Sequence, residues 1–141
     1  MNEFFGKNII SVNDFDKHQF ESIFDSVDKI IGMSRNQRYE IAKGMILGYM
    51  FFEASTRTRL SFEAAMALVG GTSLGISDII NSSVKKGETL ADTVKILSSY
   101  CDVLVLRHSL DGSSRFAAEV ADKPVINAGS GTEEHPTQTI L

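Results

Sequence analysis

The pattern of apolar and polar positions changes its period along the chain. A helical spacing of apolar residues follows candidate capping residues at Ser11, Asn13 and Asp14, and it comprises Phe20, Ile23, Phe24, Val27, Ile30 and Ile31. Residues 45–52 are instead almost continuously apolar without helical spacing, as expected of a strand buried on both faces of a parallel sheet. The pattern predicts an amphipathic helix and then a central strand.

The order of strand, polar turn and helix then repeats along the rest of the chain. A helix over 60–69 is closed by Gly70 and Gly71. Further strands are predicted at 72–76, 102–106 and 125–127, and further helices at 88–100, 114–120 and from 135 onward. Strands that alternate with helices over short connections form a parallel sheet covered on both faces. We therefore expect an α/β fold, a three-layer open parallel sheet in a single domain over residues 1–141.

Composition narrows the classes of function. The 141 residues are 43% hydrophobic, which is enough for one packed core. The net charge of -4 argues against a nucleic-acid-binding or membrane-binding surface, and no apolar run approaches the ~18 residues of a membrane span. A single cysteine, Cys101, excludes an intrachain disulfide and indicates a reducing compartment. We expect a soluble, cytoplasmic protein.

Candidate chemistry lies in the turns after the strands, because ligands of open parallel sheets bind at the carboxyl ends of strands. The first turn holds Ser55, Thr56, Arg57 and Thr58. Hydroxyl groups, the N–H groups of a helix start and a planar guanidinium all suit an anion such as phosphate. In the alternative interpretation, Ser55 or Thr56 only caps the helix and the arginines are solvated.

The second turn is a long polar loop that contains Ser82, Ser83, Lys85 and Lys86. Two lysines beside glycine and small hydroxyl residues are typical of an arm that closes on an anion. A solvated basic loop would have the same composition. The sequence leaves both interpretations open.

The third and fourth turns add an arginine and a histidine. Arg107 follows the apolar strand 102–106 and should point at the ligand crevice, whereas His108 is expected at the surface or in a supporting position. The fourth turn brings His135 and Gln138 to one side of a helix start. These turns predict a small-anion site, built without a visible cofactor or metal-ligand cluster.

Two other residues with reactive side chains have plainer interpretations. Cys101 precedes a buried strand and has no adjacent base, so a packed thiol is expected rather than a nucleophile. His18 lies in the first predicted helix and should face solvent.

Three ordered motifs carry a resemblance to a known enzyme family. They include Phe-Phe-Glu-Ala-Ser-Thr-Arg-Thr-Arg-Leu-Ser-Phe-Glu at 51–63 and His-Pro-Thr-Gln at 135–138. The first resembles the carbamoyl-phosphate signature of the carbamoyltransferase family, and the second resembles the other signature of that family. Residues 85–93, Lys-Lys-Gly-Glu-Thr-Leu-Ala-Asp-Thr, resemble the aspartate branch, because the ornithine branch usually has a Lys-Glu-Ser pattern there. The resemblance covers nearly the whole chain.

The resemblance implies transfer of a carbamoyl group from carbamoyl phosphate to the amine of L-aspartate, without a metal or other cofactor. It implies that the phosphate is held by Ser55, Thr56, Arg57 and Thr58. The carbonyl oxygen would lie among Arg107, His135 and Thr58, and Gln138 would hold the amide end. The expected catalytic residues are Arg57, Thr58, Arg107 and His135. Fixed donors of this kind stabilise charge that builds on a carbonyl oxygen.

The resemblance also implies a homotrimer with shared active sites and leaves regulatory subunits open. Lys86 and a loop serine would reach the neighbouring subunit's site, and Ser82 and Ser83 compete for the serine role. Ser130 stands where many members carry an aspartate, which should affect the turn more than the chemistry. We expect the aspartate-binding domain to be absent from this chain, so that the chain alone binds its phosphate substrate weakly and does not turn over.

Two alternative functions remain at the level of sequence. One is a carbamoyltransferase that acts on another amine, such as ornithine. The other is a non-catalytic phosphate-binding or assembly module, since half of an active site can still bind an anion. Measured turnover of a complete enzyme separates a carbamoyltransferase from a non-catalytic binding module.

Overall fold

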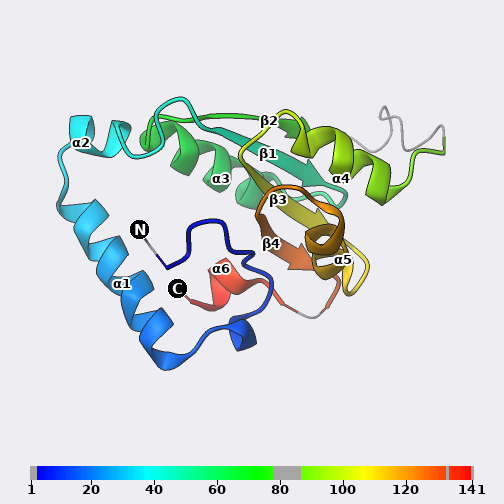
Figure 1. The fold of residues 1–141 in the computed structure, drawn as a ribbon, viewed down its shortest axis with the longest axis horizontal. Helices are drawn as coiled ribbons and strands as arrows, with labels where there is room; N and C mark the ends of the chain where they lie inside the picture. The colour runs from blue at the N-terminus through cyan, green and yellow to red at the C-terminus, as the bar shows by residue number, and fades with distance from the viewer. Residues whose placement is uncertain (1–2, 78–86, 133, 141) are drawn as a thin grey trace.

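A computed structural model describes residues 3–77, 87–132 and 134–140 (Figure 1). The elements are the 3-10 helix η1 (Val12–Asp14), α1 (Lys17–Gly32), α2 (Arg35–Tyr39), β1 (Ile46–Phe51), α3 (Thr56–Leu68), β2 (Thr72–Ile76), α4 (Leu90–Ser98), β3 (Val103–His108), α5 (Ser113–Val120), β4 (Val125–Ser130) and α6 (Pro136–Thr139). The predicted alternation of strands and helices is confirmed. In these ranges, every helix is too short or too polar to cross a membrane.

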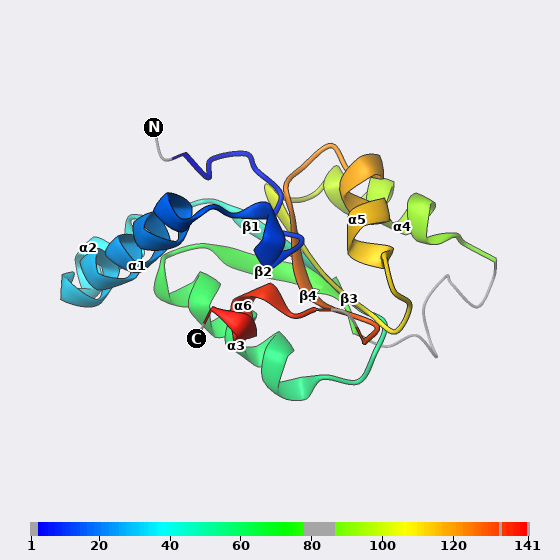
Figure 2. The ribbon, with the colours of Figure 1, turned by 90° about the horizontal axis from the view of Figure 1, so that it is seen from below.

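The four strands form one parallel sheet in the order β2-β1-β3-β4. Figure 2 shows α3 and α6 on one side of this sheet and α4 and α5 on the other. The predicted three-layer α/β architecture is confirmed. The helices that follow β1 and β4, which are α3 and α6, begin at the same edge of the sheet because the strands run in parallel.

Alternation of side chains along the strands divides the core into two clusters. In β3, Val105 packs toward α3 with Met66, whereas Leu104 and Leu106 pack toward α4 with Val94. The β3 side chains named here are fully buried. A strand buried on both faces explains why its sequence is continuously apolar.

The N-terminal segment covers the outer edge of β4. Ile9 forms a parallel bridge with Ile126, in which the Ile9 N–H donates to the Val125 carbonyl at 2.8 Å. The N–H of Asn127 in turn donates to the Ile9 carbonyl at 2.8 Å. This pairing brings residues that begin the chain beside the strand that leads to α6.

The ends of two strands differ from the prediction. Arg107 and His108 belong to β3 rather than to the following turn, and β4 continues to Ser130 instead of ending at Asn127. Neighbouring strands cause both extensions, since Arg107 is in register with Phe51 and His108 pairs with Ser130 beyond an irregularity. Ladder pairing outweighed the local signal of polar and glycine residues.

Helix starts also differ from the prediction. Ser11 caps the short η1, and Asp16 caps α1, so the predicted cap among residues 11–14 was wrong for the long helix. Thr89 caps α4, which begins at Leu90 rather than at residue 88. The short α2 was not predicted. A five-residue helix carries too little periodic signal to stand out in a sequence.

Candidate functional site

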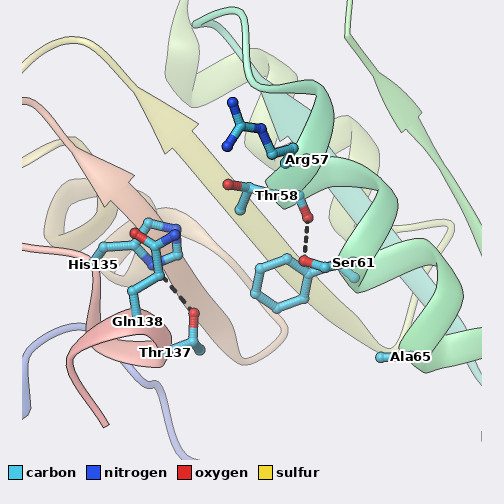
Figure 3. Close-up of a pocket in the computed structure, with 8 residues that line it drawn as sticks. Arg57, Thr58, Ser61, Ala65, His135, Thr137 and Gln138 are labelled. Carbon is cyan, nitrogen blue, oxygen red and sulfur yellow. Dashed lines mark hydrogen bonds between the residues drawn. The ribbon is translucent and has the colours of Figure 1, made fainter. Parts of the chain in front are cut away.

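A cavity of about 430 Å³ lies between the starts of α3 and α6 (Figure 3). Its lining comprises Arg57, Thr58, Ser61, Phe62, Ala65, His135, Thr137 and Gln138. The structure therefore brings together four predicted site residues from two distant segments of the sequence. They meet because both helices start where a parallel strand has just ended.

An adjoining depression of about 250 Å³ brings Arg107 into the same region. Arg107 lines it together with Gly129, and the depression shares His135 and Gln138 with the larger cavity. Three strand ends, those of β1, β3 and β4, thus contribute to one site. Ser55 and Thr56 belong to the first turn of α3 but do not line these two cavities.

The two helix starts at the site lack the side-chain caps that four other described helices have, as does α5, whose cap residue is Gly112. In the described part of the chain, η1, α1, α2 and α4 each begin with a complete capping box. Ser55 occupies the cap position of α3, and His135 that of α6, yet neither side chain makes a capping hydrogen bond. The interpretation of Ser55 as a side-chain cap is therefore wrong. The first-turn N–H groups of α3 stay available to an anion.

The two arginines of α3 have different surroundings. Arg57 lines the cavity and is exposed. Arg59 instead donates from Nη1 to Ser77 Oγ at 3.1 Å and lies 3.9 Å from the Glu63 carboxylate. Residues two positions apart on a helix are separated by about 200° of rotation, so the side chains of Arg57 and Arg59 point in different directions. Arg57 is the arginine that can meet a ligand.

Arg107 is held in place by two acceptors. Its Nε donates to Glu53 Oε2 at 3.2 Å, and its Nη1 donates to the Ala128 carbonyl at 3.2 Å. A Cβ atom built on Gly129, where φ is +120°, would lie 3.0 Å from Arg107 Nη1. Glycine at this position allows the guanidinium to approach the backbone.

His135 presents one satisfied and one unsatisfied ring nitrogen. Nδ1 lies 3.2 Å from Thr137 Oγ1, whereas Nε2 is buried and has no hydrogen-bond partner among the described residues. Burial, and secondarily the charge of Arg107, lowers the pKa of His135, so its ring is neutral near neutral pH. With Thr137 donating to Nδ1, Nε2–H can donate to a ligand oxygen. An unpaired buried donor costs about 1–3 kcal/mol, which such a ligand would remove.

Sequence reasoning missed two carboxylates that support the site. Glu53 anchors Arg107, and Glu134 accepts hydrogen bonds from Ser11 Oγ at 2.7 Å and the Val12 N–H at 2.9 Å. Each carboxylate lies near a candidate site residue in the sequence, Glu53 near Ser55 and Glu134 next to His135, and that proximity was the only sign of a supporting role. Their partners are far away in sequence, so a sequence pattern does not reveal them.

Several remaining predictions concern residues beside the site. His108 is half-buried; its Nδ1 accepts from the Leu110 N–H at 3.0 Å, and its ring contacts Phe52, which fits a supporting role. Burial lowers the pKa of His108. Ser130 is buried and lies 2.6 Å from Ser114 Oγ, so its hydroxyl joins β4 to α5.

The predictions for Cys101 and His18 are confirmed. Cys101 is buried, and that burial raises the pKa of its thiol, while the side chain of His18 is 83% exposed. Ser82, Ser83, Lys85 and Lys86 lie outside the described residues. Within the described ranges, no group of three or more His, Cys, Asp or Glu side chains could hold a metal ion.

Comparison with known proteins identifies relatives of about twice this length. Aspartate carbamoyltransferase catalytic subunits match from Nitrosopumilus maritimus, at 71% identity over 99% of this chain and 45% of the relative, and from Cenarchaeum symbiosum, at 63% over 97% and 44%. The chain therefore spans less than half the length of the curated relatives it matches.

Solved structures and a family model agree with these relatives. The catalytic subunit of M. jannaschii aspartate transcarbamoylase superposes with a TM-score of 0.88 at 44% identity, over 95% of this chain and 44% of that chain. Trypanosoma cruzi aspartate transcarbamoylase, in complex with carbamoyl phosphate, superposes with a TM-score of 0.85 at 38% identity, over 96% and 44%. The model of the aspartate/ornithine carbamoyltransferase, carbamoyl-P binding domain matches residues 7–141. The chain therefore belongs to this family of carbamoyl-phosphate-binding domains.

Proposed function

We propose that this chain is the carbamoyl-phosphate-binding part of an aspartate carbamoyltransferase. The enzyme would transfer the carbamoyl group of carbamoyl phosphate to the amine of L-aspartate, yielding N-carbamoyl-L-aspartate and phosphate for de novo pyrimidine biosynthesis. The observation that carries the proposal is the convergence of Arg57, His135 and Gln138 around one cavity at the strand ends. Membership of the family supports the same substrate.

The start of α3 is the proposed phosphate site. Arg57 offers a planar guanidinium, and the uncapped first turn offers N–H groups with the positive end of the helix dipole. Ser55, Thr56 and Thr58 add hydroxyl groups next to that turn. The local positive charge suits an anion even though the chain as a whole carries a net charge of -4.

Arg107 and His135 are proposed to surround the carbonyl oxygen, with Thr58 beside them. Attack of an amine on the carbonyl carbon places negative charge on that oxygen, and donors that are already fixed stabilise it. Glu53 and the Ala128 carbonyl fix Arg107, and Thr137 lies beside His135 Nδ1. A neutral His135 would act by donating from Nε2, without transferring its proton.

Gln138 is proposed to bind the amide end of the carbamoyl group. It lines the cavity one helical turn from His135, and its side-chain carbonyl can accept from an NH₂ group. Alignment of the carbamoyl group toward the attacking amine contributes to catalysis by reducing the entropy lost on reaching the transition state.

The names of the relatives favour aspartate over ornithine as the second substrate. The relatives at 71% and 63% identity are aspartate carbamoyltransferase catalytic subunits. The T. cruzi enzyme has also been solved in complex with carbamoyl phosphate and aspartate. We propose that residues 1–141 form one carbamoyl-phosphate-binding domain, and that aspartate is bound largely by parts of the enzyme corresponding to the unmatched half of the relatives.

The assembly is proposed to be a cytoplasmic homotrimer with shared active sites. Lys86 and either Ser82 or Ser83 would enter the neighbouring subunit's site. The support is the loop motif that resembles the aspartate branch, together with a single cysteine typical of a reducing compartment. Association with regulatory subunits is compatible with this arrangement.

Calorimetric titration of carbamoyl phosphate into the chain tests the binding step. We expect saturable binding that inorganic phosphate displaces. A complete enzyme that includes this sequence should then form carbamoyl-aspartate. Binding by the chain without turnover in the complete enzyme would instead identify a non-catalytic phosphate-binding module, and absence of binding would refute the proposal.

A further inference from the structure

Glu134, the residue that precedes His135, is clamped by the N-terminal turn. Its Oε1 accepts from Ser11 Oγ at 2.7 Å and from Asn13 Nδ2 at 3.5 Å, and its Oε2 accepts from the Val12 N–H at 2.9 Å. Ser11 is itself buried. Ser11 and Val12, which lie 123 and 122 positions before Glu134, thus donate to the same carboxylate.

The backbone of Glu134 is fixed as well. Its carbonyl accepts from the Ser130 N–H at 3.3 Å and from Asn127 Nδ2 at 3.5 Å. The same Asn127 amide donates to the Ile10 carbonyl at 2.9 Å. The end of β4, the N-terminal segment and the residue before α6 therefore form one connected network.

This network bears on the site because α6 itself is short. It spans only Pro136–Thr139, and its cap residue His135 makes no side-chain capping bond. A single helical turn has few hydrogen bonds with which to fix its own start. Burial of Pro136 anchors the helix, and Glu134, the residue before His135, adds hydrogen bonds to the distant N-terminal turn.

We propose that Glu134 is a positioning residue, which couples the Ser11–Asn13 turn to the start of α6 and so sets the place of His135 in the cavity. This inference rests on the proposed function of the site. Glu134 also lines the depression that contains Arg107, but its carboxylate accepts from the N-terminal turn, so its proposed effect on the carbamoyl group runs through His135. The N-terminal segment thereby belongs to the framework of the site, although it contributes no residue to the larger cavity.

The first test reads the His135 ring directly, without ligand, by ¹H–¹⁵N NMR of the imidazole. Glu134→Ala should shift the ring signals of His135 and move its titration toward the ordinary histidine value, because the ring loses its fixed, partly buried place. Asp16→Ala is the matched control. It also removes one carboxylate that accepts from a helix start near the N-terminus, but the Asp16 carboxylate accepts from the Gln19 N–H and not from the Ser11–Asn13 turn. Unchanged ring signals in Glu134→Ala would overturn the inference.

The second test measures affinity for carbamoyl phosphate in a double-mutant cycle. Glu134→Ala should weaken binding about two- to tenfold, the scale of one hydrogen bond between uncharged groups, because the contact that is lost is the one made by neutral His135. Adding Ser11→Ala to it should cause little further loss, because the shared contact is already gone. If the losses of affinity from the two substitutions instead multiply in the double variant, Ser11 and Glu134 act independently and the proposed coupling is contradicted. If Glu134→Ala does not fold, Ser11→Ala alone, which removes the donor at 2.7 Å from Glu134 Oε1, is measured in both tests, and wild-type results in both would overturn the inference.

The two proposals fail in different ways. A wild-type chain that does not bind carbamoyl phosphate refutes the proposed function, while the ligand-free ring signals still decide whether Glu134 places His135. Normal binding with unchanged ring signals in Glu134→Ala refutes only the positioning role.

Discussion

Arg107 Nε donates to Glu53 Oε2 at 3.2 Å and so joins the ends of two neighbouring strands at the site. Glu53 follows β1, and Arg107 lies near the end of β3. The Glu53 side chain is 45% exposed, so water screens the pair and its contribution to stability is only about 0–1 kcal/mol. Its consequence is orientation, because it fixes the direction of a cationic fork.

The first prediction separates the arginine from its anchor. Arg107→Ala should weaken carbamoyl phosphate binding by about 1.5–3 kcal/mol, the scale of hydrogen bonds to charged groups. Glu53→Gln should weaken it clearly less, because the Ala128 carbonyl still holds Nη1. Isothermal calorimetry on both variants measures the difference. Equal losses would mean that Glu53 contributes more than orientation.

The second prediction distinguishes the two arginines of α3. Arg57→Ala should weaken carbamoyl phosphate binding by about 1.5–3 kcal/mol, because a charged donor of the cavity is lost. Arg59→Ala is the control, since this side chain is engaged with Ser77 and Glu63. Its affinity should stay close to that of the wild type. If Arg57→Ala binds carbamoyl phosphate with wild-type affinity, the phosphate does not bind at the start of α3 as proposed.

The third prediction concerns the loss of stability in acid. The pKa values of His108 and His135 are lowered from 6.5 in the folded chain, mainly by burial. As the pH falls below about 6.5, these histidines therefore bind protons in the unfolded chain before they do so in the folded chain. The free energy of unfolding is highest above that pH, and it declines until the pH has passed the pKa values of the folded state. Thermal unfolding between pH 8 and 5 measures this decline.

A variant assigns part of that acid response to one ring. His108→Asn keeps an acceptor for the Leu110 N–H and removes the titration, so it should flatten the dependence of Tm on pH. A slope in His108→Asn that equals the wild-type slope would refute burial of His108 as the cause.

The fourth prediction concerns the proposed sharing of active sites between subunits. In a complete enzyme that contains this sequence, Lys86→Ala chains and Arg57→Ala chains should each be inactive alone. Mixed trimers should regain some activity, because certain sites then receive both intact residues from different subunits. Verified mixed trimers without recovery would place Lys86 in its own subunit's site or outside catalysis.

Much of the fold could be predicted from the sequence because burial imposes a pattern. The apolar run at 45–52 became β1, and the strand predicted at 72–76 was found with the same ends. Strand ends were less predictable. Arg107 looks like a turn residue in the sequence, yet the register with Phe51 keeps it in β3.

The sequence by itself determined the order of elements, the parallel architecture and the residue types of an anion site. These follow from local periodicity and from motifs read over a few consecutive residues. Only the tertiary structure decided that Arg57 rather than Arg59 lines the cavity, that Glu53 holds Arg107, and that Glu134 meets Ser11. The reason is physical: periodicity specifies which face of an element is buried, whereas the partner of a polar side chain depends on which distant strand ends the crossovers bring together.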